Sequence, residues 1–309
     1  MKIKYKFTII LPLILLKLKM QKGEIYHQAK GGLALGSAIG TFLPYAALGY
    51  TAAIYKALHP GKELPDFYRN IAGNCARMME RISLKTILGV RTEIEGVLPE
   101  TDPENERQIY ISNHPTSNGV PGIMSFVTSN FAPHFLAISK KENLRHPTAP
   151  LNFWPLKLMD ALIFIDRQSG KEAIDQIRES TQRILSNNSG LLIFPDQNRP
   201  TQKAIDYSVE KHGPVVTDQP QYTCAPRRGG LASIIEATKE VPTRFLTLTT
   251  AYNRKDETLA DAGKLSGATL HFEARDVTEE MPRNEAELGE WLNAEWVRKN
   301  RLIHDWKSA

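Results

Sequence analysis

Beyond residue 62, short apolar segments alternate with amphipathic ones, and this alternation restricts the possible folds more than any other feature of the sequence. The apolar segments are rich in β-branched and aromatic residues, which predicts strands. The predicted strands are residues 108–112, 134–138, 161–165, 190–194, 244–251 and 269–274. Residues 170–188 and 284–305 place apolar side chains on one helical face, which predicts helices. Strands alternating with helices indicate an α/β sheet covered by helices on both faces.

The N-terminal part of the chain has a different character. Residues 7–16 form an apolar run between two lysines that is too short to cross a bilayer unaided. Residues 31–55 form a second run without charged residues, with Pro44 near its middle, and this run is long enough to span. It has three interpretations: a membrane-spanning helix, a hairpin that dips into one leaflet, or a buried helical hairpin of a soluble protein. Lysines on both sides of the first run suit an anionic membrane surface but leave the orientation open.

Prolines and a glycine in residues 59–67 mark a junction between these two parts. We therefore expect residues 1–62 to be an N-terminal membrane-anchoring helical segment. Residues 63–309 are expected to form the α/β domain, with a mixed β-sheet covered by helices on both faces.

Composition narrows the function only slightly. The net charge of +5 is compatible with anionic lipids, acidic carrier proteins, phosphate-bearing ligands or nucleic acid. Nucleic acid is not an expected partner, because the basic residues are spread along the chain and form no recognition module. Cys75 and Cys224 lack the close spacing of a zinc or redox pair, and we expect reduced thiols in a cytosol-facing protein. His114, His134 and His146 lack metal-ligand spacing, so no metal site is expected.

Polar residues follow three of the predicted strands. His114, the pair Asp166 and Arg167, and Asp196 with Arg199 come after the first, third and fourth strands. Taken singly, they fit a backbone-bonded histidine, a surface salt bridge and a solvated turn. Their repetition indicates a ligand site, because ligands of open α/β sheets bind where strands end.

Four segments stand in a recognisable order along the chain. They are Asn113-His114 with the five residues that follow, a segment closing on Phe164-Ile165-Asp166-Arg167, the segment Phe194-Pro195-Asp196-Gln197-Asn198-Arg199, and Pro226-Arg227 with Gly230. In this order they resemble the four blocks of the glycerolipid acyltransferase family, the lysophosphatidic acid acyltransferases (PlsC-like), and most closely a YihG-like bacterial branch. The resemblance covers residues 65 to 305 and implies the glycerolipid acyltransferase fold.

The resemblance also implies a function. It predicts a membrane-associated O-acyltransferase that moves an acyl chain from acyl-CoA or acyl carrier protein to a lysophospholipid, with 1-acylglycerol-3-phosphate as the expected acceptor. His114 is the expected catalytic base, because an imidazole titrates near neutral pH and can take the proton of an attacking hydroxyl. The expected substrate-binding residues are Asn113, Arg167, Asp196, Arg199 and Arg227.

Among these residues, Arg199 is the first choice for the acceptor's phosphate and Arg167 the second, because forked guanidinium donors suit phosphate oxygens. Asp196 is expected to orient Arg199 or its loop. No cofactor is expected apart from the acyl donor as a substrate. The expected location is a bacterial inner membrane, with the catalytic domain facing the cytoplasm. Acyl-chain length, headgroup and oligomeric state stay open.

The chain departs from the family pattern in two blocks. Gly119 stands where the family has an aspartate, so Ser117 or Asn118 is the expected orienter of the imidazole, although neither supplies negative charge. In hydrolase triads, exchanging the carboxylate for an amide costs about 10⁴ in turnover. Gln197 replaces a glycine, and Asn198 replaces a threonine or serine.

These departures support a second hypothesis, an acyltransferase-fold protein with weak or no catalysis that binds lysolipid or acts in regulation. An unrelated hydrolase would need a Gly-x-Ser-x-Gly nucleophile elbow, which the sequence lacks.

Overall fold

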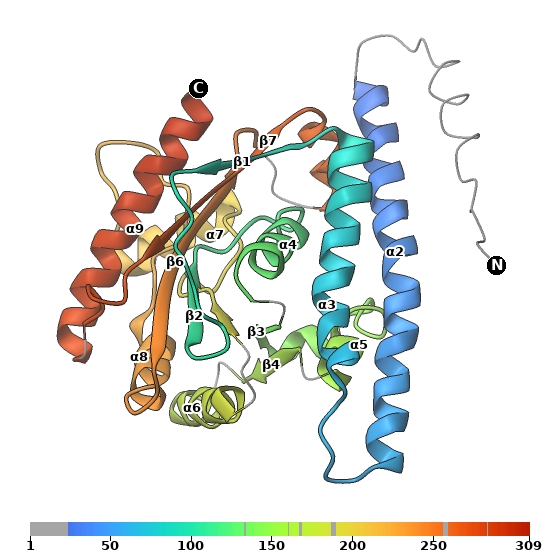
Figure 1. Cartoon of the computed structure of the whole chain (residues 1–309). Coiled ribbons are helices and arrows are strands. Elements are labelled where there is room, and N and C mark those ends of the chain that lie inside the picture. Colours follow the sequence, from blue (N-terminus) through green and yellow to red (C-terminus); the bar gives the residue numbers. More distant parts are fainter. Residues whose placement is uncertain are drawn as a thin grey trace.

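The computed structural model describes residues 24–132, 134–159, 161–166, 169–186, 190–255, 259–282 and 284–309. In these residues, a seven-stranded sheet lies between helices, and a long helix stands along one flank (Figure 1). The first apolar run, residues 7–16, and Arg167 lie outside the described residues.

All six predicted strands are present, within a few residues of their predicted ends. The strands are β1 (Arg91–Glu95), β2 (Arg107–Ser112), β3 (Phe135–Lys140), β4 (Leu162–Ile165), β5 (Gly190–Ile193), β6 (Thr243–Tyr252) and β7 (Thr269–Asp276). The sequence does not predict β1, because it carries charged side chains at alternate positions and only one apolar residue. It lies at the edge of the sheet, where charged side chains are common.

The two predicted helices correspond to α6 and α9. The helices are α2 (Glu24–Leu58), α3 (Asp66–Met79), η1 (Glu80–Leu88), α4 (Val120–Asn130), η2 (Lys141–Arg145), α5 (Phe153–Leu158), α6 (Lys171–Ser186), α7 (Gln202–His212), α8 (Arg228–Ala237), η3 (Leu259–Leu265) and α9 (Glu285–Ser308). Asn284 is the N-cap of α9, because its side chain accepts the backbone N–H of Glu287.

The order of the strands in the sheet is β1-β7-β6-β2-β5-β3-β4. From β6 to β4 neighbouring strands run parallel, whereas β7 pairs antiparallel with β6. The sheet is therefore mixed, as predicted. The carboxyl ends of β2, β5 and β6 meet at the same end of the sheet.

Both faces of the sheet are covered, as alternate residues of β2 show. Ile109 and Ile111 pack in a cluster with side chains of α6, α8 and α9. Tyr110 points to the other face and packs with side chains of η1, α4 and η3. The predicted α/β fold class is thus confirmed.

The charge-free run lies within α2, one continuous helix through Pro44 that is about 52 Å long at 1.5 Å per residue. The two hairpin interpretations are therefore wrong. The helix lies beside α3 and also contacts η1, η3 and α5 (Figure 1). Among the described residues, one helix, Tyr26–Leu58, is long and apolar enough to cross a membrane, and 17% of its most apolar window is buried in the protein. The expected boundary near residue 62 falls in the connection between α2 and α3.

Candidate active site

Asn113 ties the end of β2 to β6. Its Nδ2 donates to the carbonyl oxygen of Thr250 at 2.8 Å, and its Oδ1 accepts the backbone N–H of Thr250 at 3.0 Å. The side-chain amide thus continues the hydrogen bonding of β6 beyond the last residue of β2. Both polar ends of this predicted substrate-binding side chain face the protein, and they hold the turn that begins at His114.

Asp196 holds the same turn from the neighbouring strand. The backbone N–H of His114 donates to both carboxylate oxygens of Asp196, at 2.9 and 3.1 Å. Asp196 is buried, and it follows β5, which pairs in parallel with β2. Burial, together with the charge of Asp196, raises the pKa of the Cys224 thiol to about 12. The structure thus brings His114 and Asp196 together through the backbone of the turn.

The imidazole of His114 is half-buried and lies against Phe194, with ring centroids 4.7 Å apart. Its Nδ1 lies 2.8 Å from the carbonyl oxygen of Pro115. A carbonyl can only accept, so Nδ1 carries the proton in this contact, and Nε2 of the neutral ring keeps its lone pair. A general base needs that tautomer.

The expected orienters of the imidazole line a different cavity. Ser117 and Asn118 lie on a small cavity of about 50 Å³ next to α2. Gly119 is the N-cap of α4, and a Cβ added there would lie 3.0 Å from the Cβ of Pro115. The hydroxyl of Thr116 would be 3.5 Å from that Cβ, and it is buried without a hydrogen-bond partner in the described part of the chain.

His114 also lines a cavity of about 430 Å³, a size typical of small-ligand sites. Ile205 of α7 and Ile303 of α9 contribute apolar walls, and Lys255 and Lys307 contribute positive charge. The sequence patterns do not predict these two lysines, because one follows β6 and the other lies in the last turn of α9, outside the four segments that resemble the family.

The predicted arginines lie elsewhere. Arg199 and Arg227 do not line the cavity of His114. The backbone N–H of Arg227 donates to the carbonyl oxygen of Pro195 at 3.0 Å, and its guanidinium is exposed beside His212. Arg199 is exposed, and its guanidinium has no hydrogen-bond or ion-pair partner among the described residues.

The third arginine, Arg167, is outside the described residues, but β4 ends at Ile165, shortly before it. In the sheet, β4 lies three strands from β2, about 14 Å at the usual strand spacing.

The chain is similar in sequence and in structure to known acyltransferases. No family model matches the sequence. The 1-acyl-sn-glycerol-3-phosphate acyltransferase alpha of Ovis aries is 27% identical over 131 residues, which are 42% of this chain and 42% of that protein. The Homo sapiens protein of the same name is also 27% identical over 131 residues, 42% of this chain and 43% of that protein.

A solved structure matches over a much longer part. The crystal structure of the 1-acyl-sn-glycerophosphate (LPA) acyltransferase PlsC from Thermotoga maritima aligns with 92% of this chain and 96% of its own, with a TM-score of 0.55 and 13% identity. The chain is related to the glycerolipid acyltransferases. At that identity, the structural match shows the acyltransferase fold. In sequence, the chain spans about two fifths of the length of the curated acyltransferases it matches.

Proposed function

We propose that the protein is a membrane-associated O-acyltransferase that moves an acyl chain from acyl-CoA or acyl carrier protein to a lysophospholipid, with 1-acylglycerol-3-phosphate as the acceptor. The observation that carries this proposal is the imidazole of His114, held at Nδ1 by the Pro115 carbonyl and lining a largely apolar cavity of about 430 Å³. The names of the related acyltransferases support the choice of acceptor.

In the proposed reaction, Nε2 of His114 takes the proton of the acceptor's free hydroxyl while that oxygen attacks the carbonyl carbon of the thioester. The carbon–sulfur bond then breaks, and the departing thiolate takes the proton back from the imidazolium. Apolar walls such as Ile205 and Ile303 suit an acyl chain, since each buried methylene contributes about 0.8 kcal/mol. Lys255 and Lys307 are candidates for the phosphate of either substrate, beside the predicted arginines.

Membrane association is part of the proposal. The side chains of Leu43 and Ile54 on α2 are 51% and 59% exposed, which is costly in water and favourable in a lipid layer. A bacterial inner membrane, with the α/β domain on the cytoplasmic side, would give the site both a lysophospholipid and a cytosolic acyl donor.

The test is turnover by the full-length protein with lysophosphatidic acid and acyl-CoA, measured as diacyl product. His114→Ala should lower kcat by at least about 100-fold, the usual contribution of a general base. The control His146→Ala removes an exposed histidine near η2 and should leave kcat unchanged. Equal product from wild type and His114→Ala would contradict the proposal.

A second candidate function is lysolipid binding without turnover, and the observation that favours it is the glycine at position 119. This candidate predicts that lysophosphatidic acid binds, as calorimetry would measure, while no diacyl product forms with any acyl donor.

A further inference from the structure

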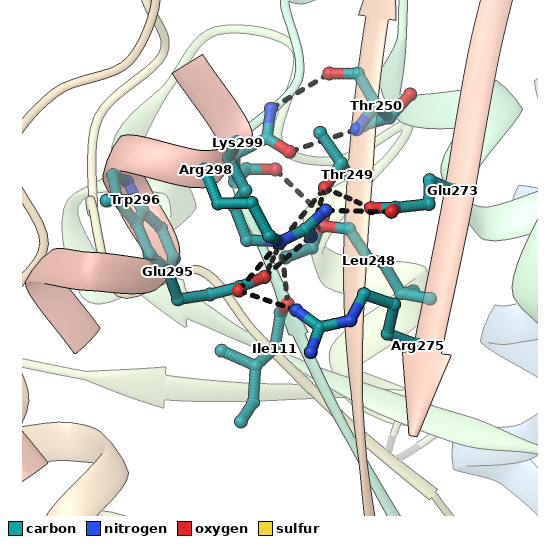
Figure 2. A network of polar contacts seen from close by, with 12 residues as sticks. Ile111, Leu248, Thr249, Thr250, Glu273, Arg275, Glu295, Trp296, Arg298 and Lys299 are labelled. Atoms are coloured by element: carbon teal, nitrogen blue, oxygen red, sulfur yellow. Dashed lines mark hydrogen bonds and ion pairs between the residues drawn. The ribbon is translucent and has the colours of Figure 1, made fainter. Parts of the chain in front are cut away.

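A buried lysine lies beneath the turn that carries His114. Lys299 of α9 is 0% exposed. Its Nζ donates to the carbonyl oxygen of Leu248 at 2.6 Å and lies 3.5 Å from the carbonyl oxygen of Ile111 (Figure 2). These carbonyls belong to β6 and β2, so one ammonium group contacts the carboxyl-terminal parts of two neighbouring strands.

The same two strands are joined again just above the lysine. Asn113 lies two residues beyond Ile111, Thr250 lies two residues beyond Leu248, and the Asn113 amide bonds both backbone groups of Thr250. Lys299 and Asn113 thus join β2 to β6 at two successive positions along the strands. His114 is the next residue after Asn113.

Acidic groups compensate the charge of this lysine. Glu295, one turn earlier on α9, has an Oε1 3.7 Å from Nζ of Lys299. Arg298 and Arg275 also contact Glu295, and Arg298 reaches Glu273 of β7 at 2.7 Å (Figure 2). Buried ion pairs of this kind are often no better for stability than apolar side chains of similar volume. Stability alone is therefore a weak reason for an ammonium at this place.

We propose that Lys299 is a positioning residue for the acyl transfer: its ammonium holds the ends of β2 and β6 together and so fixes the His114 turn. This inference rests on the proposed function in taking His114 as the base. Small displacements matter here, since a shift of about 1 Å in a reacting group costs on the order of 100-fold in rate.

The positioning carries a pH dependence. Burial lowers the pKa of Lys299 to about 8, against the opposing charge of Glu295, with Arg298 lowering it further and Glu273 and Asp196 raising it. These are the charged groups that face Lys299 from α9, β7 and the loop after β5. As pH rises through about 8, the ammonium loses its charge, its bond to the Leu248 carbonyl weakens, and kcat should fall.

The experiment compares wild type with Lys299→Met, which removes the ammonium and keeps much of the buried volume. Steady-state kinetics across pH 6.5–9.5 and amide hydrogen exchange of residues 107–116 and 245–252 are measured for both proteins. For Lys299→Met, kcat should fall about 100-fold, with KM for both substrates within about threefold. The decline near pH 8 should disappear, and exchange at His114 and Thr250 should become at least about tenfold faster.

The matched control is Leu288→Ala, which creates a cavity in the buried face of the same helix, about 16 Å along its axis from Lys299. This variant should lower the unfolding midpoint but keep kcat within about threefold and leave exchange at the two amides unchanged. Unchanged kcat and exchange in Lys299→Met would overturn the inference, as would equal losses in both variants.

Two further outcomes stay informative. If Lys299→Met does not fold, the wild-type protein is compared at pH 7 and pH 9, and exchange at His114 and Thr250 that does not exceed the intrinsic pH effect would overturn the inference. If the wild type shows no turnover, the proposed function fails, whereas the exchange measurement still decides whether Lys299 fixes the turn.

Discussion

At the scale of single residues, the backbone around His114 does part of what a carboxylate does in hydrolase triads. The contact of Nδ1 with the Pro115 carbonyl at 2.8 Å selects the tautomer of a base, but a carbonyl lacks the full negative charge that stabilises an imidazolium. Next to it, Thr116 has a buried hydroxyl without a partner among the described residues, facing the place where a side chain at Gly119 would begin. The turn therefore holds a hydroxyl that can donate to a carboxylate introduced at position 119.

We predict that Gly119→Asp raises kcat by at least about tenfold, because the new carboxylate can accept from Thr116 and stabilise the imidazolium. Residue 119 has φ −83°, which any L-residue adopts, and the Cβ needs only a small shift of Pro115. Steady-state turnover with lysophosphatidic acid and acyl-CoA measures the effect. Gly119→Asn is the control of equal shape without charge. An equal rate for both variants would show that charge at this position is irrelevant.

Gln197 has a backbone conformation that favours glycine. Its φ of 59° lies in the left-handed region, and Gln197 is the only non-glycine residue with positive φ in the described part of the chain. This conformation costs an L-residue about 1–2 kcal/mol. We predict that Gln197→Val lowers the free energy of unfolding by about 1 kcal/mol relative to wild type, since β-branched residues tolerate positive φ least. Gln197→Gly should change it by less than about 1 kcal/mol, because relief of strain and added chain entropy oppose each other. Urea denaturation of both variants measures this, and equal stability would contradict it.

At the scale of elements, α2 leaves several large apolar side chains exposed, while others, such as Tyr45 and Leu48, pack toward the domain. A Cβ added to Gly49 would lie 2.5 Å from the Cβ of Pro155, so glycine allows α2 to approach α5 closely. Besides Leu33, six of these exposed side chains recur at intervals of four and seven residues, which places them on one helical face. They are Leu35, Ile39, Leu43, Tyr50, Ile54 and Leu58. A core helix of a soluble protein has the opposite distribution.

We predict that replacing Ile39, Leu43 and Ile54 by serine lowers binding to vesicles of phosphatidylethanolamine and phosphatidylglycerol by at least about tenfold. The reason is that each half-exposed side chain gains of the order of 1 kcal/mol on entering the lipid layer. Co-sedimentation measures binding, and circular dichroism checks the fold. Val97→Ser is the matched control, since Val97 is 91% exposed but follows β1. Equal binding of the triple variant and wild type would remove α2 as the membrane contact.

At the scale of the whole molecule, buried titratable groups link stability to pH. Burial raises the pKa of the thiols of Cys75 and Cys224 from 9.0 to about 12, and it lowers the pKa of Lys299 from 10.5 to about 8. Above pH 9, the unfolded chain releases the thiol protons that the folded protein keeps, so the thiols lower the free energy of unfolding as pH rises. Between pH 8 and 10.5, the unfolded chain keeps the lysine proton that the folded protein has lost, so Lys299 raises the free energy of unfolding as pH rises.

We therefore predict that the free energy of unfolding rises from pH 8 to 9 and then falls by about 1.4 kcal/mol per pH unit up to pH 10, since two thiols outweigh one amine at about 1.4 kcal/mol each. Urea denaturation between pH 7 and 10 measures this dependence, below the range in which the buried Tyr110 adds to it. The double variant Cys75→Ser and Cys224→Ser should lose the decline. A steady decline from pH 8 in wild type would contradict the prediction. Lys299 then has opposite effects on stability and on turnover in the same pH range.

The sequence by itself determined the types and approximate bounds of most elements, because the period of apolar residues records which side of a strand or helix is buried. It also placed His114 and Asp196 at strand ends. It missed β1, whose residues alternate charged and uncharged at a sheet edge, and it did not choose between one helix and a hairpin in residues 31–55.

Tertiary structure decided which strand ends meet. The pairing of β2 with β5 and β6 brings Asp196 and Thr250 to the turn after Asn113, across 82 and 137 residues of sequence. Local periodicity carries no information on such long-range partners. Tertiary structure also decided the surroundings of the Lys299 ammonium. A lysine on an exposed helix keeps its ammonium in water. The packing of α9 across the sheet removes that water and leaves strand carbonyls in its place.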